Sequence, residues 1–115
     1  MGDRAMAEIK IEDGSLFVYT HWDGAHLPEL AKKAVLAAEP RWDDEPYAVR
    51  IIVDQLTKEG RDQETGYGLM LKPKAEDEYN GDSPSVVIDL TTKELHIFRG
   101  KHKIIPFKLI SQKEE

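Results

Sequence analysis

Three side chains near the start of the chain, His21, Asp23 and His26, form a tight group capable of acid–base chemistry or metal binding. Imidazole titrates near neutral pH and is a common metal ligand. A zinc site needs at least three convergent protein ligands, and two histidines five residues apart do not supply them alone. Asp23 also precedes Gly24, a common turn pair. Three interpretations stay open: a structural corner, a binding surface, or a catalytic or metal site. The neighbouring Trp22 is expected to anchor the corner against the helices.

A second acidic group follows the second tryptophan, in the stretch Pro40 to Ile51. Asp43 and Asp44 could act as paired carboxylates. They also stand just before a predicted helix, where an aspartate side chain can cap the free N–H groups, and capping explains them without chemistry. Arg50 and Asp54, spaced i and i+4, are expected to form a weak surface ion pair.

A third candidate lies in the stretch Ser85 to Phe98, which predicts a β-hairpin. A two-residue loop at 92–93 and a four-residue loop at 91–94 give one register, which pairs Asp89 with His96 and Val87 with Phe98. Asp89 and His96 would then form either an exposed charge pair or, inside a pocket, a proton-transfer pair. Five residues of the hairpin share the other face, which is wholly apolar and must face the helices. They are Val86, Ile88, Leu90, Leu95 and Ile97.

Periodicity predicts the elements that position these residues. Alternating stretches on either side of Asp13-Gly14 predict a hairpin, and helix-spaced apolar residues predict helices that begin near Pro28 and Glu45. Further strands are expected at 67–72, 85–90, 94–98 and about 104–110, the last containing Pro106, which suggests a sheet edge. The sequence therefore predicts an α+β fold in the order β-β-α-α-β-β-β. Its mostly antiparallel sheet has five to six strands, with two antiparallel helices packed on one face.

The second helix is predicted to be the central buried element, because apolar residues surround most of it. Two helices can cover only one face of such a sheet. Val87 and Phe98 are expected to point to the other face, where an apolar patch would favour a homodimer or another protein partner.

Composition limits the class of protein. The 115 residues contain no cysteine and predict a single domain over 1–115, with 1–6 and 111–115 as flexible ends. Net charge is −6, so a nucleic-acid partner is not expected. No signal peptide or membrane segment is recognised, which predicts a cytoplasmic protein. No sequence motif indicates a cofactor or a metal.

Four motifs resemble a family of small bacterial and bacteriophage proteins: Y-T-H-W-D-G from Tyr19, R-W-D-D-x-x-Y-x-x-R-I from Arg41, E-T-G-Y-G from Glu64 and V-V-I-D-L from Val86. The resemblance spans about Phe17 to Leu90. It implies a phage or bacterial context and carries no activity, cofactor or catalytic residue.

The leading hypothesis is a non-enzymatic protein-binding or accessory domain that acts on a host protein or on a second copy of itself. The alternative is a small metal-dependent hydrolase or nuclease that uses His21 and Asp23, or Asp89 and His96. A third possibility is a self-associating structural subunit. The candidate interaction surface comprises His21, Trp22, Asp23, His26, Val87, Asp89, His96 and Phe98.

Overall fold

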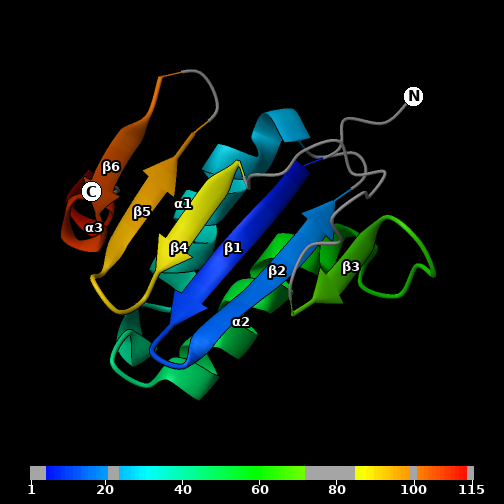
Figure 1. Ribbon diagram of the computed structural model, residues 1–115, viewed down its shortest axis with the longest axis horizontal. Helices are drawn as coiled ribbons and strands as arrows, with labels where there is room; N and C mark the ends of the chain where they lie inside the picture. The colour runs from blue at the N-terminus through cyan, green and yellow to red at the C-terminus, as the bar shows by residue number, and fades with distance from the viewer. Residues whose placement is uncertain (1–4, 21–23, 72–84, 99–100, 114–115) are drawn as a thin grey trace.

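The computed structural model describes residues 5–20, 24–71, 85–98 and 101–113. It contains a six-stranded sheet in the order β3-β2-β1-β4-β5-β6 (Figure 1). The central pair β1–β4 is parallel, and the other neighbours are antiparallel. The predicted α+β class with a mostly antiparallel sheet is therefore confirmed. The strands are β1 (Ala5–Ile11), β2 (Gly14–Thr20), β3 (Tyr67–Met70), β4 (Val86–Asp89), β5 (Glu94–Ile97) and β6 (Lys103–Pro106).

Two longer helices, α1 (Leu27–Ala37) and α2 (Glu45–Thr57), pack against each other and lie behind the sheet in Figure 1. Each has a proline in its first turn, where the missing N–H is not needed by the helix. Short 3₁₀ turns occur at Gly24–His26, Glu39–Arg41 and Lys58–Gly60. None of the helices in the described part of the chain has the length and apolar run that a membrane span requires.

The core lies between this helical layer and one face of the sheet. Alternation along the strands selects the residues that face the helices, because successive side chains of a strand point to opposite sides. The predicted apolar face of the hairpin is confirmed: its five members are all buried in this core. They are Val86, Ile88, Leu90, Leu95 and Ile97.

The more central helix is α1, and the prediction that the second helix fills this place is wrong. α2 buries one stripe at i, i+4 and i+8, formed by Ala48, Ile52 and Leu56. Its Val49, Ile51 and Val53 are only half-buried, and Tyr47 is exposed. α1 contacts α2, α3, β4 and β5. The small buried residues of this region, Ala31, Ala34 and Ala38, let these neighbours approach closely. Counting the apolar residues of α2 alone does not reveal this central position of α1.

The C-terminal element was predicted as one strand over 104–110, and this is corrected. β6 ends at Pro106, and α3 (Phe107–Lys113) follows. Proline has no N–H for a further ladder bond, and Phe107 and Ile110, spaced i and i+3, are both buried. Of the ends predicted to be flexible, Ala5 and Met6 belong to β1 and residues 111–113 belong to α3, while residues 1–4 and 114–115 lie outside the described residues.

Trp42 fixes the α1–α2 connection to α3. Its indole Nε1 donates a hydrogen bond to the Val35 carbonyl at 2.9 Å, and its ring centroid lies 5.1 Å from that of Phe107. The two rings are tilted by 46°, a favourable aromatic arrangement. This contact joins α3, which also contacts α1 and β6, to the connection between α1 and α2.

Candidate functional site

The face of the sheet opposite α1 and α2 is the main candidate surface. Among the described residues, no helix packs on it, and the strands lie in front of both helices in Figure 1. The strand registers align one residue from each of the six strands into a cross-sheet row. In sheet order the row consists of Met70, Phe17, Glu8, Val87, His96 and Ile104.

Every member of this cross-sheet row is at least partly exposed. Ile104, at the β6 end of the row, is 51% exposed. Phe98, two residues after His96, is 42% exposed. Glu8 is the charged member, and it accepts a hydrogen bond from the Ser15 hydroxyl. The row thus presents apolar side chains on both sides of a single carboxylate that already has a partner. Val87 lies on this face, as the sequence predicted.

His96 is the centre of a group of rings on the same face. Its Nδ1 lies 3.3 Å from Nε2 of His102, and its Nε2 lies 3.4 Å from a carboxylate oxygen of Glu94. The Phe98 ring stacks on His102 at 4.4 Å between centroids, with 21° between the planes. The sequence had singled out His96 and Phe98. It missed Glu94, which lies two residues before His96 on β5, and His102, whose approach depends on the pairing of β5 with β6.

The predicted pairing of Asp89 with His96 is wrong. The register places Glu94 opposite Asp89 and Val87 opposite His96, a shift of two residues that keeps every side chain on its face. Val87 is therefore also not opposite Phe98. The loop is a four-residue one at 90–93 rather than at 91–94, and Lys93 adopts a positive φ of 61° in it.

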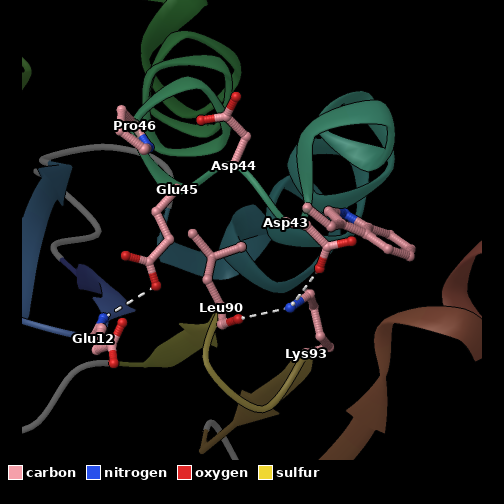
Figure 2. A pocket seen from close by; sticks show the side chains of 8 residues that line it. Glu12, Asp43, Asp44, Glu45, Pro46, Leu90 and Lys93 are labelled. Carbon is pink, nitrogen blue, oxygen red and sulfur yellow. Dashed lines mark hydrogen bonds and ion pairs between the residues drawn. The ribbon is translucent and has the colours of Figure 1, made fainter.

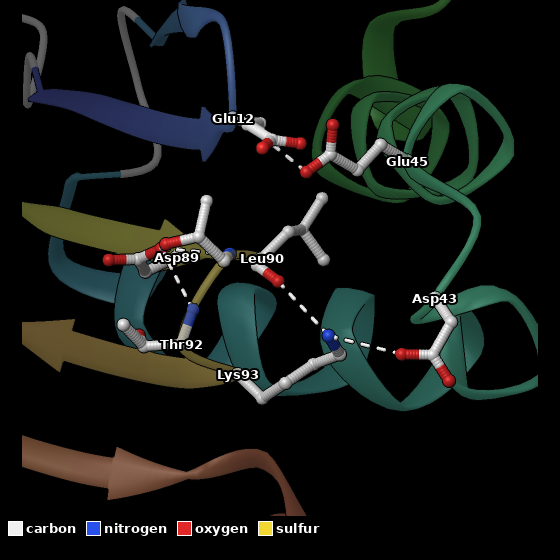
Figure 3. Close-up of polar contacts among 8 residues, drawn as sticks. Glu12, Asp43, Glu45, Asp89, Leu90, Thr92 and Lys93 are labelled. Atoms are coloured by element: carbon white, nitrogen blue, oxygen red, sulfur yellow. Dashed lines mark hydrogen bonds and ion pairs between the residues drawn. The ribbon is translucent and has the colours of Figure 1, made fainter.

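The Asp89 side chain explains this turn (Figure 3). Its Oδ1 accepts hydrogen bonds from the Thr91 amide at 2.9 Å, the Thr91 hydroxyl at 2.6 Å and the Thr92 amide at 3.3 Å. This is an Asx-type turn, for which the Asp-x-Thr-Thr sequence is a recognisable signal. Burial acts to raise the pKa of Asp89, but these hydrogen bonds and the charge of Lys10 outweigh it and lower the pKa below its ordinary value.

A separate cavity of about 380 Å³ opens at the start of α2 (Figure 2). The ammonium group of Lys93 lies between the Leu90 carbonyl, at 3.2 Å, and the Asp43 carboxylate, at 3.1 Å. On the other side, Glu45 accepts a hydrogen bond from the Glu12 amide at 3.1 Å. These contacts tie the first turn of α2 to the β1–β2 and β4–β5 turns.

The predicted side-chain capping by Asp43 or Asp44 is not formed. Asp44 is the N-cap of α2 by position, but its side chain makes no capping hydrogen bond and lies 3.9 Å from Arg41. Asp43 pairs with Lys93 instead. Each carboxylate therefore has its own cation, an arrangement unlike a carboxylate pair that shares one proton. The predicted Arg50–Asp54 pair is also replaced, since Asp54 lies 2.7 Å from Arg61.

The first candidate group can be followed only in part. His21, Trp22 and Asp23 lie outside the described residues. His26 is exposed and precedes α1 without a side-chain capping bond. Within residues 5–20, 24–71, 85–98 and 101–113, no group of three or more His, Asp or Glu side chains could hold a metal ion. No family model, no curated protein and no solved structure matches this chain.

Proposed function

We propose that this chain is a non-enzymatic protein-binding domain of bacterial or phage origin that acts in the cytoplasm. Its binding surface would be the helix-free face of the sheet, centred on the cross-sheet row. The observation that supports the proposal is the composition of this row. It carries four apolar side chains and one imidazole over six neighbouring strands, at partial exposure. An exposed apolar surface bounded by polar groups is typical of protein interaction sites.

Charge favours a partner other than a second copy. The chain carries a net charge of −6, so two copies repel each other, whereas a protein of net positive charge is attracted. We therefore take the partner to be a basic host protein that presents an apolar patch. A homodimer through the same face is the competing arrangement, since a two-fold axis would bring one cross-sheet row onto its copy.

The hydrolase or nuclease alternative has less support. Of its two residue pairs, Asp89 and His96 do not lie opposite each other, because Asp89 pairs with Glu94 and His96 with Val87. The Asp89 carboxylate also accepts hydrogen bonds from its own turn. The other pair, His21 and Asp23, lies outside the described residues and stays a prediction.

The test compares capture from a bacterial lysate by the parent chain and by two substitutions in the cross-sheet row, Val87→Ser and Ile104→Ser. Leu109→Ser is the matched control, because Leu109 is similarly exposed (47% against 51% for Ile104) but belongs to α3. We expect a basic protein that the parent and the control retain and both row variants lose, with weaker capture at high salt.

Two outcomes would contradict the proposal. Equal capture by the row variants would place the binding surface elsewhere. A parent dimer in light scattering that Ile104→Ser converts to a monomer, without any captured protein, would assign the face to self-association.

A further inference from the structure

His96 belongs to the cross-sheet row, and its imidazole faces that of His102, which lies outside the row. The two imidazoles together allow an interaction that the protein-binding proposal does not require. Their nearest nitrogens are 3.3 Å apart, the ring centroids are 5.5 Å apart, and the planes differ by 27°. The geometry points to a binding site for a divalent late first-row transition ion, of the Zn²⁺, Ni²⁺ or Cu²⁺ type. Its protein ligands are Nδ1 of His96 and Nε2 of His102.

The separation of the two nitrogens fits a tetrahedral ion. Zinc–imidazole bonds of about 2.0–2.1 Å at a tetrahedral angle place two ligand nitrogens about 3.3–3.4 Å apart. In the absence of an ion the same separation accommodates a long N–H···N hydrogen bond, in which one ring donates and the other accepts. His102 is exposed and lies outside any strand, so a small adjustment of its position directs both lone pairs to one point while its ring stays stacked on Phe98.

Two neighbouring side chains, Glu94 and Phe98, set the tautomer and the orientation of the histidine rings. The carboxylate of Glu94, 3.4 Å from Nε2 of His96, favours the tautomer whose proton is on Nε2, which leaves Nδ1 free to act as a ligand. Phe98 stacks against both imidazoles, at 4.4 Å from His102 and 6.1 Å from His96 between centroids. Held in this way, the rings lose less rotational freedom when an ion binds.

The site supplies two protein ligands, one fewer than a dedicated zinc site requires, and water completes the coordination shell of a weakly bound ion. Its affinity is therefore lower than that of a closed zinc site with four protein ligands. Nitrogen ligands favour Cu²⁺ over Ni²⁺ and Zn²⁺, in the usual order of divalent affinities. Mg²⁺ and Ca²⁺, which prefer oxygen ligands, should not bind here.

The experiment is calorimetric titration of the full chain with Zn²⁺ and Ni²⁺, together with NMR spectra of the histidine rings. We expect one ion per chain and perturbed ring signals from His96 and His102. The single substitutions His96→Ala and His102→Ala should each weaken binding at least tenfold. Glu94→Gln should weaken it by up to about tenfold, as expected when a carboxylate that orients a ligating histidine is lost.

His26→Ala is the matched control, because His26 is also exposed but lies at the start of α1. It should bind the ion as the parent does. Circular dichroism establishes that each variant is folded, and the exposed position of His102 makes His102→Ala the variant least dependent on packing. Saturable binding that survives His102→Ala, or no saturable binding up to millimolar ion, would overturn the site and leave the histidine pair as a hydrogen bond.

Discussion

The two faces of the sheet differ because, in the part of the chain that the structure describes, helices pack on only one of them. Along β4, Val86 and Ile88 are both fully buried at 0% exposure, while Val87 between them is half-buried. Along β5, Leu95 faces the helices and the next residue, His96, faces the opposite side. One strand thus supplies both the core and the candidate binding surface. The comparison separates residues that hold the fold together from residues available to a partner.

The largest effect is expected from a charge placed in the core, between the helices and the sheet. Ile52 of α2 is completely buried, so Ile52→Asp places a carboxylate without a partner in the core, at a cost of several kcal/mol. We expect no cooperative thermal transition in circular dichroism. The control Glu29→Ala removes an exposed side chain of α1 and should melt as the parent does. A normal transition for Ile52→Asp would show that the core has been placed wrongly.

Two adjacent residues of β4 compare the two faces of the sheet directly. Ile88→Ala removes three buried carbons and should lower the free energy of unfolding by about 2–5 kcal/mol. Val87→Ala, one residue away on the helix-free face, should lower it by about 1 kcal/mol or less, because its side chain already contacts water in part. Urea unfolding of both variants measures the difference. Equal losses would mean that the two faces are equally packed.

Asp89 tests a residue of the helix-free side that is nonetheless buried, since it is only 7% exposed and accepts hydrogen bonds from its own turn. Asp89→Ala leaves the Thr91 and Thr92 amides without their acceptor, which should cost about 1–3 kcal/mol at neutral pH. Asp89→Asn keeps an acceptor oxygen and should lose less. Urea unfolding at pH 7 provides both values, and a silent Asp89→Ala would show that the turn does not depend on this side chain.

The lowered pKa of Asp89 predicts that the free energy of unfolding depends on pH. Because the folded-state pKa of Asp89 lies below its ordinary value of 3.8, the ionised carboxylate stabilises the fold above that pH. This contribution is lost as the pH falls through the lowered pKa. The difference in unfolding free energy between the parent and Asp89→Asn should therefore be largest near neutral pH and should shrink below pH 3.8. A difference that grows toward acid pH would reverse the assigned direction.

The smallest effect is expected at the exposed Asp43–Lys93 ion pair. The Asp43 side chain is 95% exposed, so solvent screens its attraction to Lys93. Asp43→Ala should change the free energy of unfolding by no more than about 0.5 kcal/mol. A change above about 1 kcal/mol, measured by urea unfolding, would give the contacts at the start of α2 a larger structural role than this exposure implies.

Local periodicity accounts for what the sequence predicted correctly. The alternation from Val86 to Ile97 identified the buried face of the β4–β5 hairpin, and that face is the same in the observed register because the error was two residues. The buried stripe of α1 likewise follows from helical spacing. These features depend on residues close together in the chain.

The candidate site was predicted less completely, because it depends on contacts between distant segments. Val87 and His96 were singled out, but Glu8 reaches their row only through the parallel pairing of β1 with β4. Nothing in either strand's own pattern specifies that pairing. The turn before β5 was a different kind of miss, because its signal is local: the Asp89 side chain accepts hydrogen bonds from the Thr91 and Thr92 amides.

The sequence by itself determined the α+β class and the apolar faces of α1 and of the β4–β5 hairpin, because these follow from side-chain periodicity. Tertiary structure alone decided the strand order, the position of α1 at the centre of the helical layer, and the approach of His102 to His96. The physical reason is that contacts between distant segments are selected by the packing of the whole core, and local patterns allow several such arrangements with the same buried faces.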